Sequence, residues 1–468
     1  MRRAAIDRLA AALALLAGGC ALAPPPSVDQ VRGEALPNTA VPARWAAGPA
    51  DTGEVDDAWL LLFRDPALQE LITEAMLYNT DLQAAAARVD AAAASASAAG
   101  AALFPQVNLM GHGGGKMGGD ASGLQLAGLF ASWEIDLWGR VRSGRDAATA
   151  QYEAVVLDER YARASIAALV AKSWFLAREA AVQKRIAGEM VDAAKELAGL
   201  SRNRLDVGKA DELEVAQADA SVLNYGDLVL QADIARQNAL RAIEILAGRY
   251  PSGAIDPGEA LPPPGPMIPT GLPSQLLERR PDVRAAERRV AAAFHATQQA
   301  RAARLPRISL TASGSSVSSE LFVLKERDNP VWSVGANLLM PVFDAGALRA
   351  QVDARTADEK AAVANYGRVG ARAFSEVESA LSTSFNLDSR AELLERAVRA
   401  NERALGFARV RFEIGSGDQR AVQQQLLALS SARTSLTHVL TERLIQRVNL
   451  HLALGGGFEP PVSAAAAQ

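Results

Sequence analysis

The chain has 468 residues, a formal net charge of −4, a single cysteine, and aromatic residues at only 5% of its length. This charge excludes the general basic surface of a nucleic-acid-binding protein, and one cysteine excludes an internal disulfide or a multi-thiolate metal site. Alanine supplies much of the hydrophobic content, as in residues 84–102. Because alanine favours helix formation and lets helices approach closely, we expect long packed helices rather than a bulky core.

The N-terminus has the pattern of a secretory signal, predicted to cover residues 1–19. Three arginines within the first eight residues precede a short apolar run over residues 9–17, and two glycines precede Cys20. Small residues directly before a lone cysteine resemble a bacterial lipobox, which implies that Cys20 becomes the lipid-bearing first residue. A plain signal peptide that happens to contain a cysteine is the alternative. Ala21 follows where lipoproteins kept in the inner membrane often carry aspartate, so the outer membrane is favoured.

Proline-rich segments divide the rest of the chain. We expect a lipid-anchored, extended tether and N-terminal segment over residues 20–60, and a linker over residues 251–272. Between and after these lie a first repeat over residues 61–250 and a second over residues 273–456. Residues 457–468 are predicted to form a C-terminal tail.

The two repeats share one pattern, and this is the most informative feature of the sequence. Matching residues lie 207 positions apart, as in the pairs Gly139 and Gly346, Arg204 and Arg411, Gly208 and Gly415, and Gly248 and Gly455. Each half then reads as a helix, a β-hairpin, a very long helix, a tight turn and a last helix. The first helices are expected over residues 68–103 and 281–305, because Pro105 and Pro306 cannot continue them.

A pair of strands is expected after the first helix of each half. The predicted strands cover residues 106–115, 124–137, 307–316 and 331–342. Polar and apolar residues alternate from Arg307 to Ala312, which is the period of a two-faced strand. Strands of about ten residues suit a membrane crossing, whereas no later segment is apolar for long enough to cross as a helix. Since lipid does not tolerate the open edges of a four-stranded sheet, several chains should share one barrel.

Three tryptophans lie near the ends of these hairpins: Trp133, Trp138 and Trp332. They either form an interfacial aromatic belt or pack where the strands meet the helices. Both interpretations stay open at the level of the sequence.

A very long helix follows each hairpin, the first from Arg140 to Asn203. In the second half, a mostly apolar stripe steps by three and four residues over seven heptads, which predicts coiled-coil packing. The stripe consists of Val363, Tyr366, Gly370, Ala373, Val377, Ala380, Ser384, Leu387, Ala391, Leu394, Val398, Asn401, Leu405, Ala408 and Phe412. A lipid-anchored structural coiled coil is an alternative, but it does not explain the matched hairpins.

Four segments, in their order and spacing, resemble the TolC-like outer-membrane efflux factors, specifically the lipoprotein branch that serves tripartite RND-type pumps. They are residues 63–68 (FRDPAL), 133–140 (WEIDLWGR), 246–251 (LAGRYP) and 277–283 (LERRPDV). The resemblance extends from Cys20 to about Gly456. It implies a mainly α fold with two structural repeats, a long α-helical coiled-coil barrel and four strands per chain.

In that family, three chains form a 12-stranded transmembrane β-barrel and a passive duct. The resemblance therefore implies a homotrimer that exports small molecules such as drugs, solvents or metal ions. The implied partners are a periplasmic adaptor protein, an inner-membrane pump and outer-membrane lipid. A duct for protein secretion is a close alternative.

The turns that end the two long helices match the tips where the family docks its adaptor. The matching residues are Val207, Gly208, Lys209, Ala210, Ile414, Gly415, Ser416 and Gly417. A plain helix-connecting turn is the alternative, and both interpretations can hold together. The family also narrows its tunnel with acidic residues shortly after the turn glycine. Here those positions offer Glu214 in the first half but Gln424 in the second, and Glu214 also fits a capping box that starts at Asp211.

Catalytic patterns are poor. Among the four histidines, only His438 has a plausible co-ligand, Glu442, and two ligands do not make a zinc site. The glycine-rich stretch 111–119 lacks an accompanying nucleophile motif and the Ser or Thr of a phosphate loop, so we interpret it as a hairpin loop. We therefore expect no enzyme activity, no metal site and no cofactor.

Overall fold

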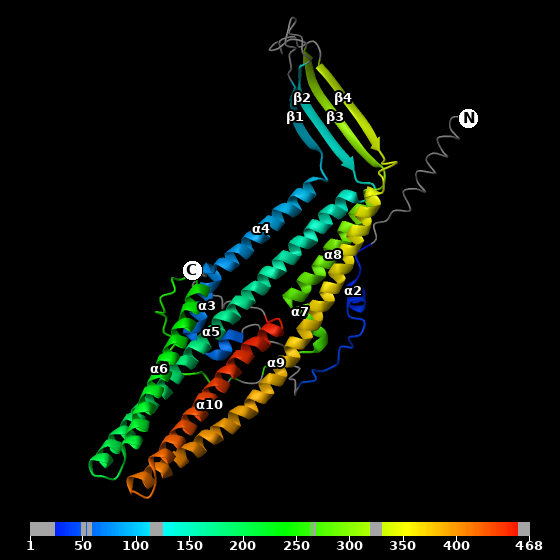
Figure 1. Cartoon of the computed structure of the whole chain (residues 1–468). Helices are drawn as coiled ribbons and strands as arrows, with labels where there is room; N and C mark the ends of the chain where they lie inside the picture. Colours follow the sequence, from blue (N-terminus) through cyan, green and yellow to red (C-terminus); the bar gives the residue numbers. More distant parts are fainter. Residues whose placement is uncertain are drawn as a thin grey trace, which may run out of the picture. The chain divides into compact units, whose positions relative to one another are not determined.

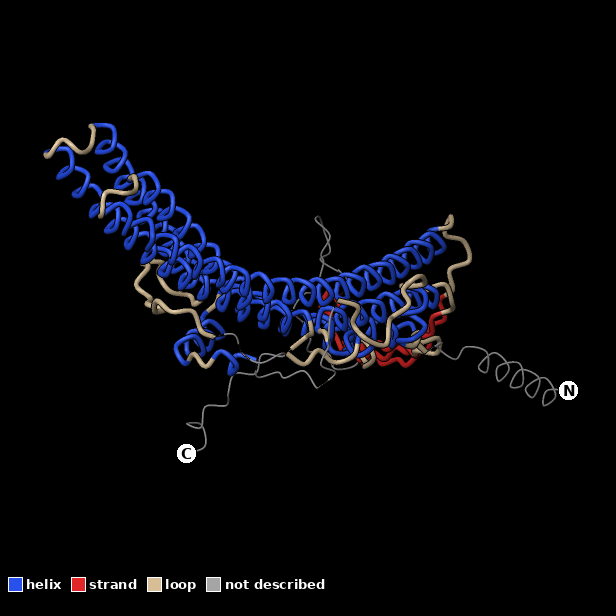
Figure 2. The backbone as a smooth tube through the Cα atoms, turned by 90° about the horizontal axis from the view of Figure 1, so that it is seen from below, coloured by secondary structure: helices blue, strands red, loops and turns tan. Residues whose placement is uncertain are grey.

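The computed structural model describes residues 24–47, 53, 59–112, 125–263, 265, 268–318 and 330–456. Helices make up most of these residues, and the described strands all belong to one sheet (Figure 1, Figure 2). The predicted mainly α fold with a β part is therefore confirmed. The predicted signal peptide, Cys20 and the predicted tail over residues 457–468 lie outside the described residues.

Both halves of the chain contain the same order of elements. The first half contains α3 (Pro66–Tyr78), α4 (Thr80–Ala101), β1 (Gln106–His112), β2 (Gln125–Ile135), α5 (Arg140–Asp206) and α6 (Glu212–Leu246). The second half contains η2 (Pro273–Gln275), α7 (Leu276–Arg279), α8 (Pro281–Ala302), β3 (Arg307–Ser318), β4 (Pro330–Leu339), α9 (Ala347–Glu413) and α10 (Gln419–Ala453). Helices α5 and α9 each have 67 residues, and α6 and α10 each have 35. The predicted order is thus confirmed.

The repeated glycines hold the same backbone conformation in both halves. The φ angles are 72° and 87° at Gly139 and Gly346, 70° and 76° at Gly208 and Gly415, and 72° and 73° at Gly248 and Gly455. Residues with a side chain rarely adopt this left-handed region. The sequence repeat is therefore also a repeat of backbone geometry, with glycine placed where each long element begins or ends.

The predicted single helix over residues 68–103 is wrong in one respect, because it breaks at Asn79. The backbone N–H of Asn79 closes α3 on the carbonyl of Ala75, and its side-chain oxygen accepts from the backbone N–H groups of Asp81 and Leu82. A short polar side chain of this kind competes with the helical hydrogen bonds and caps the next helix.

The N-terminal segment, predicted as an extended tether, is ordered in the part that the structure describes. Helix α2 (Val28–Ala35) begins at Ser27 with a complete capping box. The indole of Trp45 is buried beside Phe374, with ring centroids 6.5 Å apart, and its N–H donates to the carbonyls of Thr270 and Gly271. A cap and a buried aromatic side chain supply the stabilisation that a proline-rich tether would lack.

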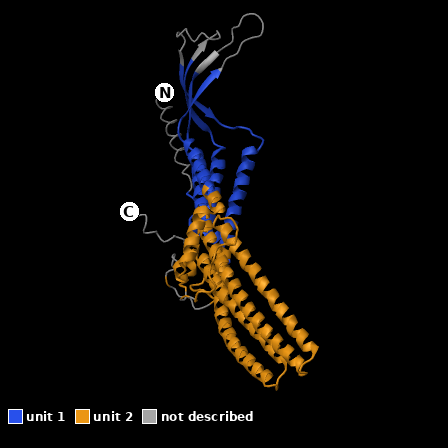
Figure 3. Ribbon diagram, turned by 90° about the vertical axis from the view of Figure 1, so that its left-hand side faces the viewer, with its two compact units in different colours: residues 1–39, 87–157, 282–369 blue, residues 40–86, 158–281, 370–468 orange. Residues whose placement is uncertain are grey.

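The chain forms two compact units, coloured separately in Figure 3. The first contains residues 1–39, 87–157 and 282–369, and the second contains residues 40–86, 158–281 and 370–468. The four strands lie in the first unit and form an antiparallel sheet in the order β1-β2-β3-β4. In the second unit, α5 and α6 form one antiparallel helical hairpin, and α9 and α10 form the other (Figure 1, Figure 3).

The core of the second unit gathers around α5. The short helix η1 (Trp59–Phe63) and α3 pack there against residues of α5, α6 and α10 in one buried cluster. Nearer the turns, Met190, Leu197, Phe412 and Leu426 belong to a second cluster that joins the two hairpins. All fifteen residues of the predicted stripe on α9 are buried or half-buried, so the heptad pattern did identify the packed face.

Glu244 ties the proline-rich linker to α6. Its buried carboxylate accepts from the backbone N–H groups of Gly253 and Ala254, at 2.6 and 2.8 Å, and from the hydroxyl of Ser252. Burial alone would raise the pKa of Glu244, but these hydrogen bonds to the charged form lower it overall. The linker is therefore held at a defined place on the helix.

Among the described residues, none of the helices combines the length and the apolar character that a membrane crossing requires.

Candidate functional site

The strand register sorts the side chains of the sheet onto two different faces. Residues directly opposite each other in an antiparallel pair point to the same side, and successive residues alternate. The pairs Leu129↔Gly314 and Leu310↔Ala336 thus belong to one face, and Ser132↔Thr311 to the other. One face is apolar and carries Val107, Leu109, Leu129, Ala131, Trp133, Ile135, Ile308, Leu310, Ala312, Trp332, Val334, Ala336 and Leu338. The opposite face is mostly polar and carries Gln106, Asn108, Ser132, Glu134, Arg307, Ser309, Thr311, Ser313, Ser333 and Asn337.

The apolar face is exposed. Ten large hydrophobic residues are exposed in the described parts of the strands, and eight of them lie on this face. The two on the polar face are Met110 and Leu339. Exposing a contiguous apolar surface of this kind to water is unfavourable, so a protein partner or a membrane must cover this face. The polar face satisfies its own groups in part, since the hydroxyls of Ser313 and Ser333 lie 2.9 Å apart.

The segment 133–140, which carried part of the family resemblance, forms the connection from strand β2 to helix α5. The guanidinium of Arg140 donates two hydrogen bonds, of 2.7 and 2.8 Å, to the carboxylate of Glu134. Burial tends to lower the pKa of Arg140, but the hydrogen bond to Glu134, the largest effect, raises it. Asp136 accepts from the backbone N–H groups of Val141 and Arg142 at the first turn of α5. These residues fix how the strand enters the helix.

The three tryptophans have different surroundings. The indole N–H of Trp133 donates to the carbonyl of Leu103 at 2.8 Å, and that of Trp138 donates to the carbonyl of Pro306 at 2.7 Å. Trp332 is 79% exposed and lies on the apolar face. The first two therefore brace the ends of the strands, while Trp332 has the surroundings expected of a belt residue.

The two turns at the ends of α5 and α9 have the same geometry. The N–H of Gly208 donates to the carbonyl of Leu205 and that of Lys209 to Arg204, which is a Schellman pattern. Gly415 and Ser416 repeat it with Phe412 and Arg411. Asp211 then caps α6 through the N–H of Glu214, and Asp418 caps α10 through the N–H of Ala421, each at 2.8 Å. The structure thus makes each predicted tip a rigid, capped turn.

Each turn exposes an apolar side chain at the same place in the repeat. Val207 is 66% exposed and Ile414 is 72% exposed. Of the other predicted tip residues, Gly208, Lys209, Gly415 and Ser416 are exposed, and Ala210 and Gly417 are half-buried. An exposed branched aliphatic residue beside rigid backbone is a surface suited to a protein partner.

Two contacts join the turns to each other. The guanidinium of Arg204 lies over the ring of Phe412, 4.6 Å from its centroid. The amide of Gln419 donates to the backbone carbonyl of Glu214 at 3.0 Å. Sequence reasoning did not find Gln419, because nothing local distinguishes the first residue of α10 from its polar neighbours.

The candidate constriction residues lie in different surroundings. Glu214 is half-buried, and its Oε2 atom is buried without a hydrogen-bond partner among the described residues. Gln424 is exposed. Of the predicted capping box, the first half is present, since the side chain of Asp211 accepts from the backbone N–H of Glu214. Among the described residues, the Glu214 side chain accepts no return bond from the Asp211 backbone. The two constriction residues therefore differ in their packing, and they are not counterparts in the repeat, because residue 214 corresponds to Ala421 and residue 424 to Gln217.

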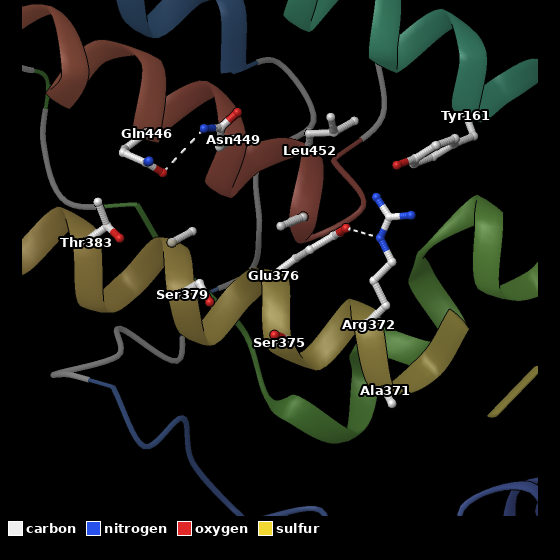
Figure 4. Close-up of a pocket in the computed structure, with 12 residues that line it drawn as sticks. Tyr161, Ala371, Arg372, Ser375, Glu376, Ser379, Thr383, Gln446, Asn449 and Leu452 are labelled. Carbon is white, nitrogen blue, oxygen red and sulfur yellow. Dashed lines mark hydrogen bonds and ion pairs between the residues drawn. The ribbon is translucent and has the colours of Figure 1, made fainter. Parts of the chain in front are cut away.

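A polar groove of about 720 Å³ opens between α9, α10 and Tyr161 of α5. Figure 4 shows Arg372 beside Glu376 on α9, with the Arg372 side chain directed toward Tyr161 of α5; Gln446 and Asn449 of α10 also line the groove. On its other side, Glu376 accepts from the guanidinium of Arg280 at 2.7 Å, and Arg280 also donates to the carbonyl of Ala453 at 3.0 Å. Arg280 lies in the segment 277–283 that carried part of the resemblance, so that motif fixes a helix junction.

His438 does not pair with Glu442 in the way that the sequence suggested. Its Nδ1 atom lies 3.1 Å from the Oε1 atom of Glu179 on α5. Within the described part of the chain, no group of three or more His, Cys, Asp or Glu residues is arranged to hold a metal ion.

The paired long helices and the two-faced sheet belong to a protein whose apolar strand face contacts a membrane or a partner, and comparison with known proteins identifies its class. The chain belongs to the outer membrane efflux protein family, whose model matches residues 71–249 and 272–456. This confirms the resemblance to TolC-like efflux factors.

Individual relatives match over nearly the whole chain. The pyoverdine export outer membrane protein OpmQ of Pseudomonas aeruginosa is 31% identical, over 95% of each chain. The toluene efflux pump outer membrane protein TtgC of Pseudomonas putida is 30% identical, over 96% of this chain and 95% of TtgC. The solved structure of the outer-membrane channel OprN has a TM-score of 0.84 and 29% identity, and covers 90% of this chain and 97% of that one. This protein is thus an outer-membrane efflux channel subunit.

Proposed function

We propose that three copies of this chain form a passive duct that carries small molecules across the periplasm and the outer membrane. The four strands of each copy close a shared 12-stranded barrel, with the apolar face toward lipid and the polar face toward the lumen. The exposed apolar face carries this proposal, because only a membrane or a partner makes eight exposed large hydrophobic residues favourable.

Two neighbouring residues of β4 test the assignment of the faces. Val334 lies on the apolar face and Ser333 on the polar face. An arginine on the lipid face of a barrel costs roughly 2–4 kcal/mol near the middle of the membrane, whereas lumen positions tolerate charge. Val334→Arg should therefore prevent heat-modifiable trimers from accumulating in the outer membrane, and Ser333→Arg should not. The opposite result would reverse the faces.

A lipid on Cys20 anchors each chain, on the evidence of its place after a short apolar run and two glycines. Labelled fatty acid should enter the protein in vivo, and Cys20→Ala should abolish that labelling. Equal labelling of the variant would remove the lipid from the proposal without affecting the duct.

The turns at Val207–Ala210 and Ile414–Gly417 dock a periplasmic adaptor, which links the duct to an inner-membrane pump. The support is the matched pair of rigid turns, each with an exposed aliphatic residue. A cysteine that replaces Lys209 or Ser416 should crosslink to the adaptor, while one at Gly118, which lies between β1 and β2 in the sequence, should not. Crosslinking from Gly118 alone would remove the two turns from the proposed docking surface.

The exported substrate belongs to the class of small molecules. OpmQ and TtgC are named for pyoverdine and toluene, which are chemically unlike each other. A duct whose selectivity lies mainly with the pump accounts for that range. Deletion of the gene should sensitise cells to the substrates of its pump, and a Val334→Arg variant should fail to restore resistance.

A further inference from the structure

Only two charged residues occur on the described strands, and both lie on the polar face. They are Glu134 on β2 and Arg307, the first residue of β3. The register places Glu134 opposite Ser309, and Arg307 opposite Leu339. Residues 307 and 309 point to the same side because they are two positions apart.

The two charges differ in how they are balanced. The carboxylate of Glu134 accepts hydrogen bonds from the Nε and Nη2 atoms of Arg140, so the charge of Glu134 is neutralised within the chain. Arg307 is exposed, and among the described residues its guanidinium has no hydrogen-bond or ion-pair partner. The polar face therefore presents one uncompensated positive charge at the end of the sheet nearest the helices.

We propose that Arg307 forms a ring of three positive charges in the lumen at the base of the barrel and that this ring favours anionic solutes in the duct. The inference rests on the proposed trimer with its polar face inward. Three like charges around one pore raise the local concentration of counter-ions, as charged rings do in channel filters. The solutes favoured are those that carry carboxylate, sulfate or phosphate groups, which a guanidinium binds with two parallel hydrogen bonds.

The test measures reversal potentials of the purified trimer in planar bilayers under a potassium chloride gradient. Arg307→Gln should lower the ratio of chloride to potassium permeability by about threefold at 0.15 M salt, where the screening length is about 8 Å. At 1 M salt, where that length is about 3 Å, the two proteins should have similar ratios.

Two further variants separate a charge effect from damage to the fold. Leu339 lies opposite Arg307 on the same face, so Arg307→Gln combined with Leu339→Arg should restore the original ratio. Arg304 lies outside the sheet, close enough to Asp344 to influence the pKa of that carboxyl group. Arg304→Gln also removes one positive charge, and it should change the ratio of chloride to potassium permeability less than Arg307→Gln does. An equal effect of Arg304→Gln, or an unchanged ratio in Arg307→Gln, would overturn the inference. An absence of conductance in the unaltered protein would instead overturn the proposed duct.

Discussion

Arg280 offers the sharpest test of how the second unit is held together. Its side chain is 1% exposed and joins the start of α8 to Glu376 of α9 and to the carbonyl of Ala453 at the end of α10. Glu376 has a second arginine partner, Arg372, whose side chain is 67% exposed. Arg280→Met and Arg372→Met therefore remove two different arginines from one carboxylate.

The structure sets the size of each effect. Breaking a fully buried ion pair costs about 3–5 kcal/mol because the remaining charge is left uncompensated. Glu376 is 31% exposed and would keep Arg372, so we expect about 2–3 kcal/mol for Arg280→Met. The exposed pair is worth at most about 1 kcal/mol, as surface ion pairs usually are.

Native-state hydrogen exchange measures this difference locally. The amides of Leu454 and Gly455, which close the end of α10, should exchange about 30- to 150-fold faster in Arg280→Met. In Arg372→Met, the increase should stay below about fivefold. Equal increases in the two variants, or none in Arg280→Met, would refute the view that burial of Arg280 holds this junction.

Three other changes test single features. Gly248→Ala should lower the melting temperature, as measured by circular dichroism, more than Gly208→Ala does. Both glycines have a positive φ, so both substitutions strain the backbone. Only at residue 248 would the added Cβ also clash, because it would lie 2.6 Å from a backbone oxygen, whereas a Cβ at residue 208 would meet nothing within 4 Å. Folding lowers the pKa of Glu244 from its usual 4.5. The ionised Glu244 carboxylate therefore adds stability above pH 4.5, and this stability is lost as the pH falls through the lower pKa that Glu244 has in the folded protein. Limited proteolysis of the linker should thus increase on acidification, and less so in Glu244→Gln. In the planar bilayer, Glu214→Gln should shift the selectivity of the trimer toward anions, and Ala421→Asp should shift it toward cations. Unchanged selectivity would leave Glu214 as a helix-end residue only.

Local patterns in the sequence predicted most of the fold. The 207-residue offset between matched glycines located both long helices and both turns, since a glycine with positive φ acts through the backbone of its own neighbours. The heptad stripe identified the buried face of α9 for the same reason, because helical periodicity is a local property.

The tertiary structure alone decided which distant residues meet. No sequence pattern indicates that Arg280 contacts Glu376, 96 positions away, or that Gln419 reaches the backbone of Glu214. The register between β2 and β3, which joins the two halves, settled which strand residues share a face and so placed Arg307 on the polar side. Such contacts depend on how separate helices and strands pack, and a one-residue shift in register would have moved Arg307 to the opposite face.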